Sequence, residues 1–159
     1  MAAKKWFLLS STLAVLSVFF AAATLRAKPD DPWTAQQTVQ PADFAQELQQ
    51  EKDSYPTVIY VGVKTLYEGA HIPGAVFYGP GSTDRGLAEL KKFASTLPRN
   101  SDVVLYCGCC PLEKCPNLRP AFTALQASGF ARLRVLILPT SFNIDWVEKG
   151  FPVHKGEKP

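Results

Sequence analysis

The sequence predicts an α/β domain whose mostly parallel sheet is covered by helices on both faces. Short, nearly continuous apolar runs alternate with amphipathic segments of helical spacing, as in buried parallel sheets. The length of 159 residues suits one domain and not two. A composition of 47% hydrophobic and 19% charged residues excludes a disordered chain or a collagen-like repeat. The net charge of +3 is too small and too dispersed for a nucleic-acid-binding surface, so we expect no nucleic-acid partner.

The first segment of the chain resembles a targeting sequence in its composition. Lys4 and Lys5 precede an uncharged, mostly apolar run over residues 6–23 that ends in three alanines, an order typical of a secretory signal peptide. An uncleaved membrane anchor is the alternative, because this run nearly reaches the length of a bilayer-spanning helix. We therefore expect residues 1–27 to be a signal peptide or membrane anchor. The rest would be exported, either periplasmic or secreted, and free or tethered through residues 6–23.

Residues 28–39 are predicted to be a linker between this segment and the domain. Pro and Asp dominate positions 29–32, and no apolar period runs through the segment. The sequence leaves open whether Trp33 packs on the domain or stays exposed. The folded domain is expected to cover residues 40–156.

The first half of the domain is predicted to contain two helices and two strands. A helix over residues 41–51 is favoured by a proline at its first position and by apolar residues that share one face. Strands are predicted at 57–61 and 75–78, which are short β-rich runs bounded by Pro or Gly. Residues 84–97 form an amphipathic pattern that ends before a proline, so a second helix is expected there.

The second half repeats this alternation. A strand at 103–106 ends directly at Cys107, and a helix over 117–128 ends at a glycine. A strand at 134–138 and a helix over 141–149 complete the domain. Ligands of parallel α/β sheets bind at the carboxyl ends of the strands, so Cys107 lies where a site is expected.

All four cysteines lie in the loop that follows this strand, in the pattern C-x-C-C-x4-C from Cys107 to Cys115. A strand–loop–helix joint directs backbone N–H groups to one point, and the helix N-terminus adds partial positive charge there. A thiol at that point should have a lowered pKa, and an anion could be held beside it. We therefore predict that Cys107 is a catalytic nucleophile. The predicted substrate-binding residues are Gly108, Cys109, Cys110, Lys114 and Arg119.

Three alternative roles for the cysteine cluster stay open. In an oxidising compartment, Cys110 and Cys115 could form a structural disulfide. The four thiols also offer soft ligands for Zn²⁺ or Cu(I), although their spacing matches no structural zinc site well. Finally, cysteines such as Cys109 and Cys115 could be buried simply as small apolar side chains.

Four segments of the chain together resemble a rhodanese-like (sulfurtransferase) domain. The run YEGAHIPGA at 67–75 is similar to the signature Y-x-x-G-H-I-P-G-A of that family. Residues 103–107 resemble its strand that ends in the catalytic cysteine. Residues 119–130 resemble the helix that follows, and residues 146–153 resemble its closing W-x-x-x-G-Y-P-V motif. The order and spacing of these segments agree over most of the domain.

The resemblance implies a single rhodanese-like domain that moves a sulfane sulfur from a donor such as thiosulfate to a thiophilic acceptor. By resemblance, Cys107 would carry the sulfur as a persulfide, and Arg119 would occupy the position of the family's loop-end arginine. No metal or cofactor is implied. The expected partner is a small sulfur-containing anion or a protein thiol acceptor.

The chain departs from the family in its active-site loop. Arg119 follows Cys107 by twelve positions, so the loop is longer than usual and holds three additional cysteines. Cys110 or Cys115 is therefore a candidate for resolving a persulfide as a disulfide. The family's L-D-V-R becomes IYVG at 59–62, which removes its Asp–Arg pair. A non-catalytic module, acting as a metal-binding or thiol–disulfide redox element through the cluster, is the alternative function.

Overall fold

The computed structural model describes residues 31–50 and 55–156. The predicted signal peptide or membrane anchor at 1–27 lies outside the described residues. Among the helices of the described ranges, none is both long enough and apolar enough to cross a membrane.

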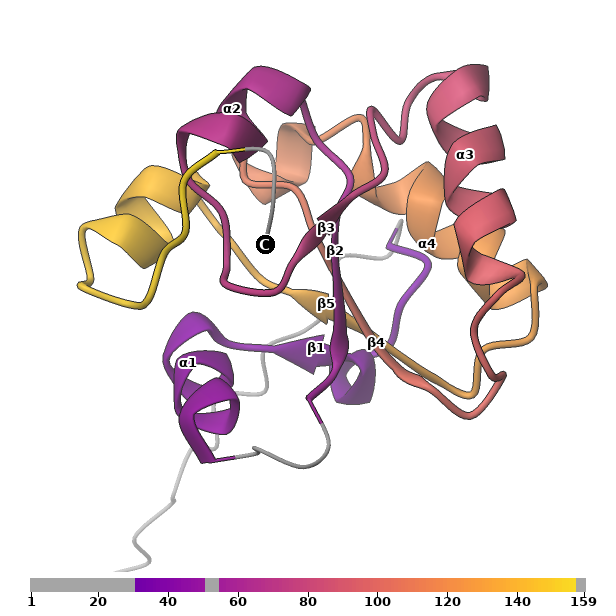
Figure 1. The fold of residues 1–159 in the computed structure, drawn as a ribbon, viewed down its shortest axis with the longest axis horizontal. Coiled ribbons are helices and arrows are strands. Elements are labelled where there is room, and N and C mark those ends of the chain that lie inside the picture. Colours follow the sequence, from indigo (N-terminus) through magenta and orange to yellow (C-terminus); the bar gives the residue numbers. More distant parts are fainter. Residues whose placement is uncertain (1–30, 51–54, 157–159) are drawn as a thin grey trace, which may run out of the picture.

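Within the described residues, five parallel strands form one sheet in the order β1-β5-β4-β2-β3 (Figure 1). The central strand β4 pairs with β2 on one side and with β5 on the other. The predicted α/β fold with a parallel sheet is therefore confirmed. The strands are β1 (Thr38–Val39), β2 (Thr57–Tyr60), β3 (Val76–Phe77), β4 (Asp102–Tyr106) and β5 (Arg132–Leu136).

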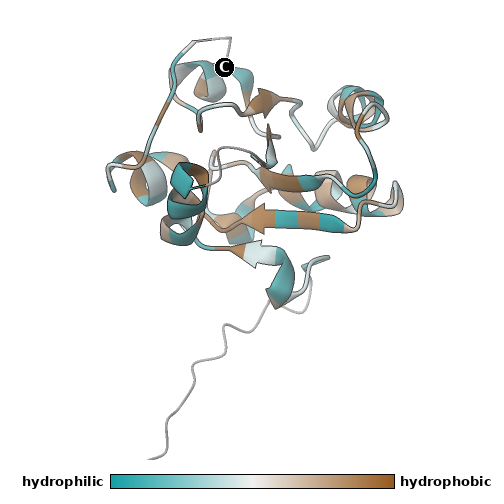
Figure 2. Cartoon of the chain, turned by 60° about the horizontal axis from the view of Figure 1, so that its bottom comes forward, coloured by the Kyte–Doolittle hydropathy of each residue, from teal (hydrophilic) through white to brown (hydrophobic). Residues whose placement is uncertain are grey.

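Helices cover both faces of the sheet, as the sequence predicts. Side chains alternate along β4, so Leu105 packs in the core under α3 and α4, while Tyr106 packs in the core under α1, α2 and η3. The central strands are accordingly mostly apolar, whereas the helices carry both apolar and polar residues (Figure 2). The helices are α1 (Pro41–Gln50), α2 (Lys64–Gly69), α3 (Asp84–Ala94) and α4 (Leu118–Ala127), with the short turns η1 (Ala35–Gln37), η2 (Leu112–Lys114) and η3 (Asn143–Val147).

The structure differs from the sequence-based expectation at both ends of the domain. Trp33 and strand β1 belong to the segment interpreted as a linker, yet Trp33 is 3% exposed and packs edge-on against Phe122. A two-residue strand shows no period, and its pairing with β5 becomes visible only in three dimensions. The helix expected over 141–149 is reduced to the π-helical turn η3. The sequence does not predict helix α2, because Tyr67 is its only buried residue and no apolar stripe reveals it.

The two central strands send their connections in opposite directions. Strand β2 leads to α2 on one face and then outward to β3. Strand β4 leads to α4 on the other face and then to β5. Such a reversal opens a crevice at the carboxyl ends of two adjacent parallel strands. The loop that begins at Cys107 lies at this crevice.

The core beneath η3 can be tested at Trp146. This side chain is fully buried, and its indole N–H donates to Pro152 O at 2.8 Å. The Trp146→Ala substitution should lower the free energy of unfolding by about 3–5 kcal/mol, as for other buried aromatic residues. Ile144→Ala, in the same turn but 42% exposed, should change it by less than about 0.5 kcal/mol. Chemical denaturation measures both, and equal losses would contradict this assignment of the core.

Candidate active site

The cysteine loop begins with a tight turn at Gly108. This residue has φ = +72°, which glycine adopts readily and other residues rarely do. Its carbonyl accepts a hydrogen bond from Phe142 N–H at 3.0 Å, and a Cβ on Gly108 would lie 2.5 Å from Phe142 Cβ. Both the dihedral angle and the space therefore require glycine. The turn leaves Cys107 pointing into the α3–α4 core, where it is 2% exposed.

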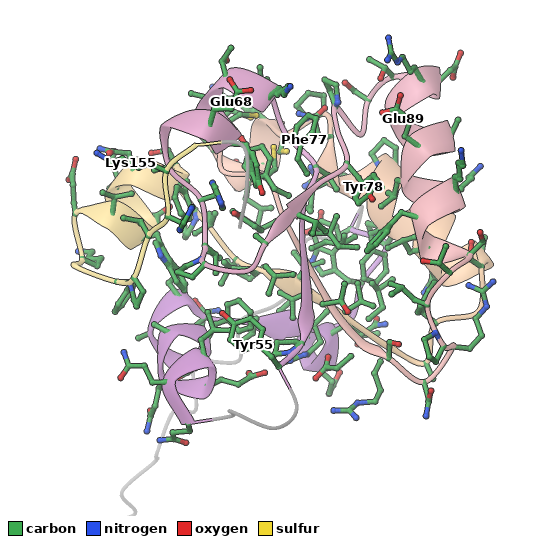
Figure 3. All side chains as sticks on the ribbon, in the orientation of Figure 1. Tyr55, Glu68, Phe77, Tyr78, Glu89 and Lys155 are labelled. Atoms are coloured by element: carbon green, nitrogen blue, oxygen red, sulfur yellow. The ribbon has the colours of Figure 1, made fainter. Side chains whose placement is uncertain are left out.

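Three of the cysteines form a compact group of sulfur atoms. The Sγ atoms of Cys107, Cys109 and Cys115 all lie within 4.8 Å of one another. Cys109 Sγ is 3.2 Å from Cys107 Sγ and 3.4 Å from Cys110 Sγ. The four cysteines are free thiols in this structure. Figure 3 shows sulfur atoms gathered near α2 in that view, at the crevice end of the sheet. We call Cys107, Cys109 and Cys115 the three-thiol cluster.

Asn117, directly before α4, donates a side-chain N–H toward this cluster. Its Nδ2 lies 3.5 Å from Cys107 Sγ and 3.7 Å from Cys109 Sγ. Its Oδ1 accepts the backbone N–H of Ser82 at 3.1 Å, and this contact determines which end of the amide faces the sulfur atoms. Asn117 is 3% exposed. From the sequence this position is recognisable only as a helix start, because its contact with the thiols depends on the path of the loop.

The electrostatics of the cluster differ from the sequence-based expectation. The neighbouring thiol of Cys107, together with backbone N–H groups of Asn117 and Leu118, lowers the pKa of Cys115 below its usual range. The proximity of Cys115 and burial raise the pKa of Cys107 above its usual range. The physical reason is the length of the loop, which places Cys115 rather than Cys107 at the N-terminus of α4. The surroundings therefore favour the charged form of Cys115 over that of Cys107.

Burial also affects the neighbouring thiol of Cys110. Desolvation, with a hydrogen bond to Cys109 as the next cause, raises the pKa of Cys110 to about 12. Cys110 is thus neutral, and its sulfur lies at the edge of the three-thiol cluster rather than within it.

A pocket of about 440 Å³ opens beside the loop, between α2 and η3. Cys109 and Gly108 line it, together with Tyr60, whose side chain is 1% exposed. The Tyr60 hydroxyl has no hydrogen-bond partner of good geometry within the described residues, and burial raises its pKa, so it is a neutral donor. Lys155 also lines the pocket, because Gly156 N–H bonds Glu68 O at 2.8 Å and holds the C-terminal segment against α2 (Figure 3).

Cys107 itself borders a much smaller cavity. This cavity measures about 10 Å³ and is lined by Cys107, Cys110, Cys115 and leucine side chains. Such a volume is about that of one water molecule, so no thiosulfate-sized ligand fits there in this conformation. A ligand in the larger pocket instead reaches the cluster through Cys109.

The two basic residues of the loop lie away from the sulfur atoms. Arg119 forms an ion pair with Asp31 at 2.6 Å and donates to the carbonyls of Leu112 and Cys115 at 3.1 and 3.3 Å. These contacts hold the loop to the N-terminal segment. Lys114 is exposed at the end of η2. The loop thus brings the four cysteines and Gly108 together, and the predicted substrate-binding roles of Arg119 and Lys114 stay predictions.

The fold has relatives among solved structures, although no family model and no curated protein matches the sequence. The structure is similar to the rhodanese-like domain of the Alr3790 protein from Anabaena sp., with a TM-score of 0.55, 19% identity and coverage of 76% of this chain and 80% of that chain. The BH2092 protein from Bacillus halodurans gives a TM-score of 0.58 and 18% identity over 76% of this chain and 77% of that chain.

A third similar structure is the thiosulfate sulfurtransferase from Pseudomonas aeruginosa. The TM-score is 0.55 and the identity 26%; the match covers 76% of this chain but only 20% of that chain. Together these neighbours show that the chain has a rhodanese-like fold, as the motifs at 67–75 and 103–107 imply.

The tight turn at the start of the loop can be tested against a matched glycine. Gly129 has φ = +83° with no atom within 4 Å of an added Cβ, whereas Gly108 has the same kind of dihedral angle and a close neighbour. Gly129→Ala should therefore cost only the dihedral strain, about 1–3 kcal/mol. Gly108→Ala should cost roughly a further 1–3 kcal/mol for the overlap with Phe142. Denaturation curves measure both free energies, and a Gly108→Ala loss no larger than that of Gly129→Ala would contradict the packing.

Proposed function

We propose that this chain is a sulfurtransferase that moves a sulfane sulfur from a small anionic donor, such as thiosulfate, to a thiophilic acceptor. The observation that carries the proposal is the position of Cys107, which follows the central strand β4 at the crevice between oppositely directed connections. The rhodanese-like fold supports it, as does the activity in the name of the Pseudomonas aeruginosa enzyme that shares this fold. The proposal includes export to the periplasm or secretion, with the domain free or tethered.

In the first half-reaction, the Cys107 thiolate attacks the outer sulfur of thiosulfate. A new S–S bond forms on Cys107, the bond between the two sulfur atoms of thiosulfate breaks, and sulfite leaves with the electron pair. The proton that Cys107 loses has an acceptor in Cys115, within 4.8 Å. The Asn117 amide, 3.5 Å from Cys107 Sγ, donates a hydrogen bond that favours the charged form of the sulfur.

The larger pocket provides groups that suit an anionic donor. The buried hydroxyl of Tyr60 is an unpaired donor, and Lys155 adds a positive charge. A volume of about 440 Å³ is ample for thiosulfate and also admits a cysteine side chain of an acceptor protein. Cys109 lines the larger pocket and Cys107 does not. The loop between Gly108 and Cys110 therefore has to move before a donor in this pocket can reach Cys107.

In the second half-reaction, the persulfide sulfur passes to cyanide or to a thiol, and Cys107 returns as a thiolate. The persulfide can also be resolved within the loop itself. The Cys115 thiolate can attack the inner sulfur of the persulfide, which forms a Cys107–Cys115 disulfide and releases hydrosulfide; an external thiol then reduces the disulfide. Cys115 belongs to the three-thiol cluster and Cys110 does not, so Cys115 is the better placed of the two candidate resolving residues.

The role of Cys107 is tested by intact mass spectrometry after incubation with thiosulfate. The wild-type protein should gain about 32 Da, one sulfur atom, that reductant removes. Cys107→Ser should lose this adduct and reduce thiosulfate:cyanide activity to background, because the nucleophile is gone. The three thiols that the variant keeps serve as internal controls. An active Cys107→Ser protein that still carries the adduct would contradict the proposal and place the reacting sulfur on another cysteine.

The contribution of Asn117 can be isolated with Asn117→Asp. The carboxylate keeps the size of the side chain and the acceptor for Ser82 N–H, but it removes the donor to Cys107 and adds a negative charge. A hydrogen bond to a charged group is worth about 1.5–3 kcal/mol, so kcat/KM should fall roughly tenfold to a hundredfold. Ser82→Ala is the control, because Ser82 contacts Asn117 through its backbone alone. Equal rates for the two variants would exclude this role.

A further inference from the structure

Sulfur transfer needs one nucleophilic cysteine, but the three-thiol cluster contains three. We propose that Cys107, Cys109 and Cys115 together bind one Cu(I) ion. This proposal is based on the geometry of the three sulfur atoms and does not depend on whether Cys107 transfers sulfur. In the part of the chain that the structure describes, these three Sγ atoms lie close enough together to bind one metal ion, and all three ligands are thiols.

The distances between the sulfur atoms fit a trigonal site. Metal–thiolate bonds are about 2.3 Å long, so three sulfur atoms around a central ion are about 4 Å apart. The three Sγ atoms here lie within 4.8 Å of one another, and the distance between Cys107 Sγ and Cys109 Sγ is 3.2 Å. Adjustments of less than about 1 Å would bring them to the ideal spacing. The turn at Gly108 and the start of α4 already hold the ligands near these positions.

The ligand set favours a soft ion over a harder one. Thiolates select Cu(I), Zn²⁺ or iron–sulfur clusters, and they are poor ligands for hard cations. A structural zinc site almost always has four ligands. Cys110 is the remaining thiol and lies beside the cluster, 3.4 Å from Cys109 Sγ, but its sulfur is not within 4.8 Å of all three ligand atoms. Both histidines are elsewhere, beside each other with ring centroids 5.3 Å apart. Three thiolates suit Cu(I), which is stable at lower coordination than zinc.

The surroundings protect such an ion and offset its charge. Cys107 and Cys115 are 2% and 4% exposed, and Leu118 packs in the same core, so solvent is excluded from most of the site. Three thiolates and one Cu(I) ion leave a net negative charge, which the N-terminus of α4 and the Asn117 amide stabilise. Cys109 is half-buried and lines the larger pocket, so this ligand provides the route by which the ion enters and leaves.

Copper binding and sulfur transfer would exclude each other at any one moment. Both need the Cys107 sulfur, and a metal-bound thiolate is no longer a free nucleophile. We therefore expect copper-loaded protein to gain no sulfur from thiosulfate until the ion is removed.

The test is an anaerobic titration of the reduced, full-length protein with Cu(I) in competition with a chromophoric Cu(I) chelator. We expect one ion per chain, with ultraviolet absorption from thiolate-to-copper charge transfer. Cys109→Ser and Cys115→Ser should each weaken binding at least tenfold, because each removes one of three ligands. Cys110→Ser is the matched control and should bind with the wild-type affinity. Circular dichroism of each variant establishes that it is folded before its affinity is compared.

Three outcomes would overturn the site. They are wild-type protein that does not compete for Cu(I), folded Cys109→Ser or Cys115→Ser protein with undiminished affinity, and a preference for Zn²⁺ that depends on Cys110. The thiosulfate adduct on Cys107 is measured on the same samples without copper. Copper binding without an adduct would contradict the proposed sulfurtransferase alone, and an adduct without copper binding would contradict the metal site alone.

Discussion

The contact between Gly108 and Phe142 determines how the rest of the site is arranged. The chain leaves the central strand at this point with a positive φ and passes so close to Phe142 that no side chain fits between them. As a result, Cys107 is buried in the α3–α4 core, while Cys109 packs against the edge of the same core and also lines the larger pocket. A single turn thus gives two neighbouring thiols different surroundings, one enclosed and one accessible.

The length of the loop has an electrostatic consequence as well as a steric one. In a short loop, the amides at the start of the following helix would point at the cysteine that ends the strand. Here the additional residues bring Cys115 to the start of α4, where it receives those amides. Asn117 compensates in part, because its buried side chain donates toward Cys107 and Cys109. The thiol with the lowered pKa and the thiol at the end of the strand are therefore two different cysteines of one cluster.

Much of the fold could be predicted from the sequence, because its cause is local. The apolar runs at 57–61 and 103–106 are strands since they are buried on both faces, and the strand that ends at Cys107 follows from its residues alone. The burial of Trp33 and the pairing of β1 depend on partners far along the chain, such as Phe122 and β5. The same is true of Asn117, whose contact with sulfur exists only after the loop has folded back. Residues whose role comes from distant contacts leave no periodic signal.

The ion pair between Arg119 and Asp31 joins positions 88 residues apart, and the same guanidinium donates to two carbonyls of the cysteine loop. Closing so long a loop costs conformational entropy, which has to be offset by the other contacts that the N-terminal segment makes. Until this segment docks, the four thiols are open to oxidants and to one another. If the proposed export takes place, chains in which the N-terminal segment has not docked expose these thiols to an oxidising compartment. Docking of the N-terminal segment would then protect the sulfur atoms as well as complete the fold.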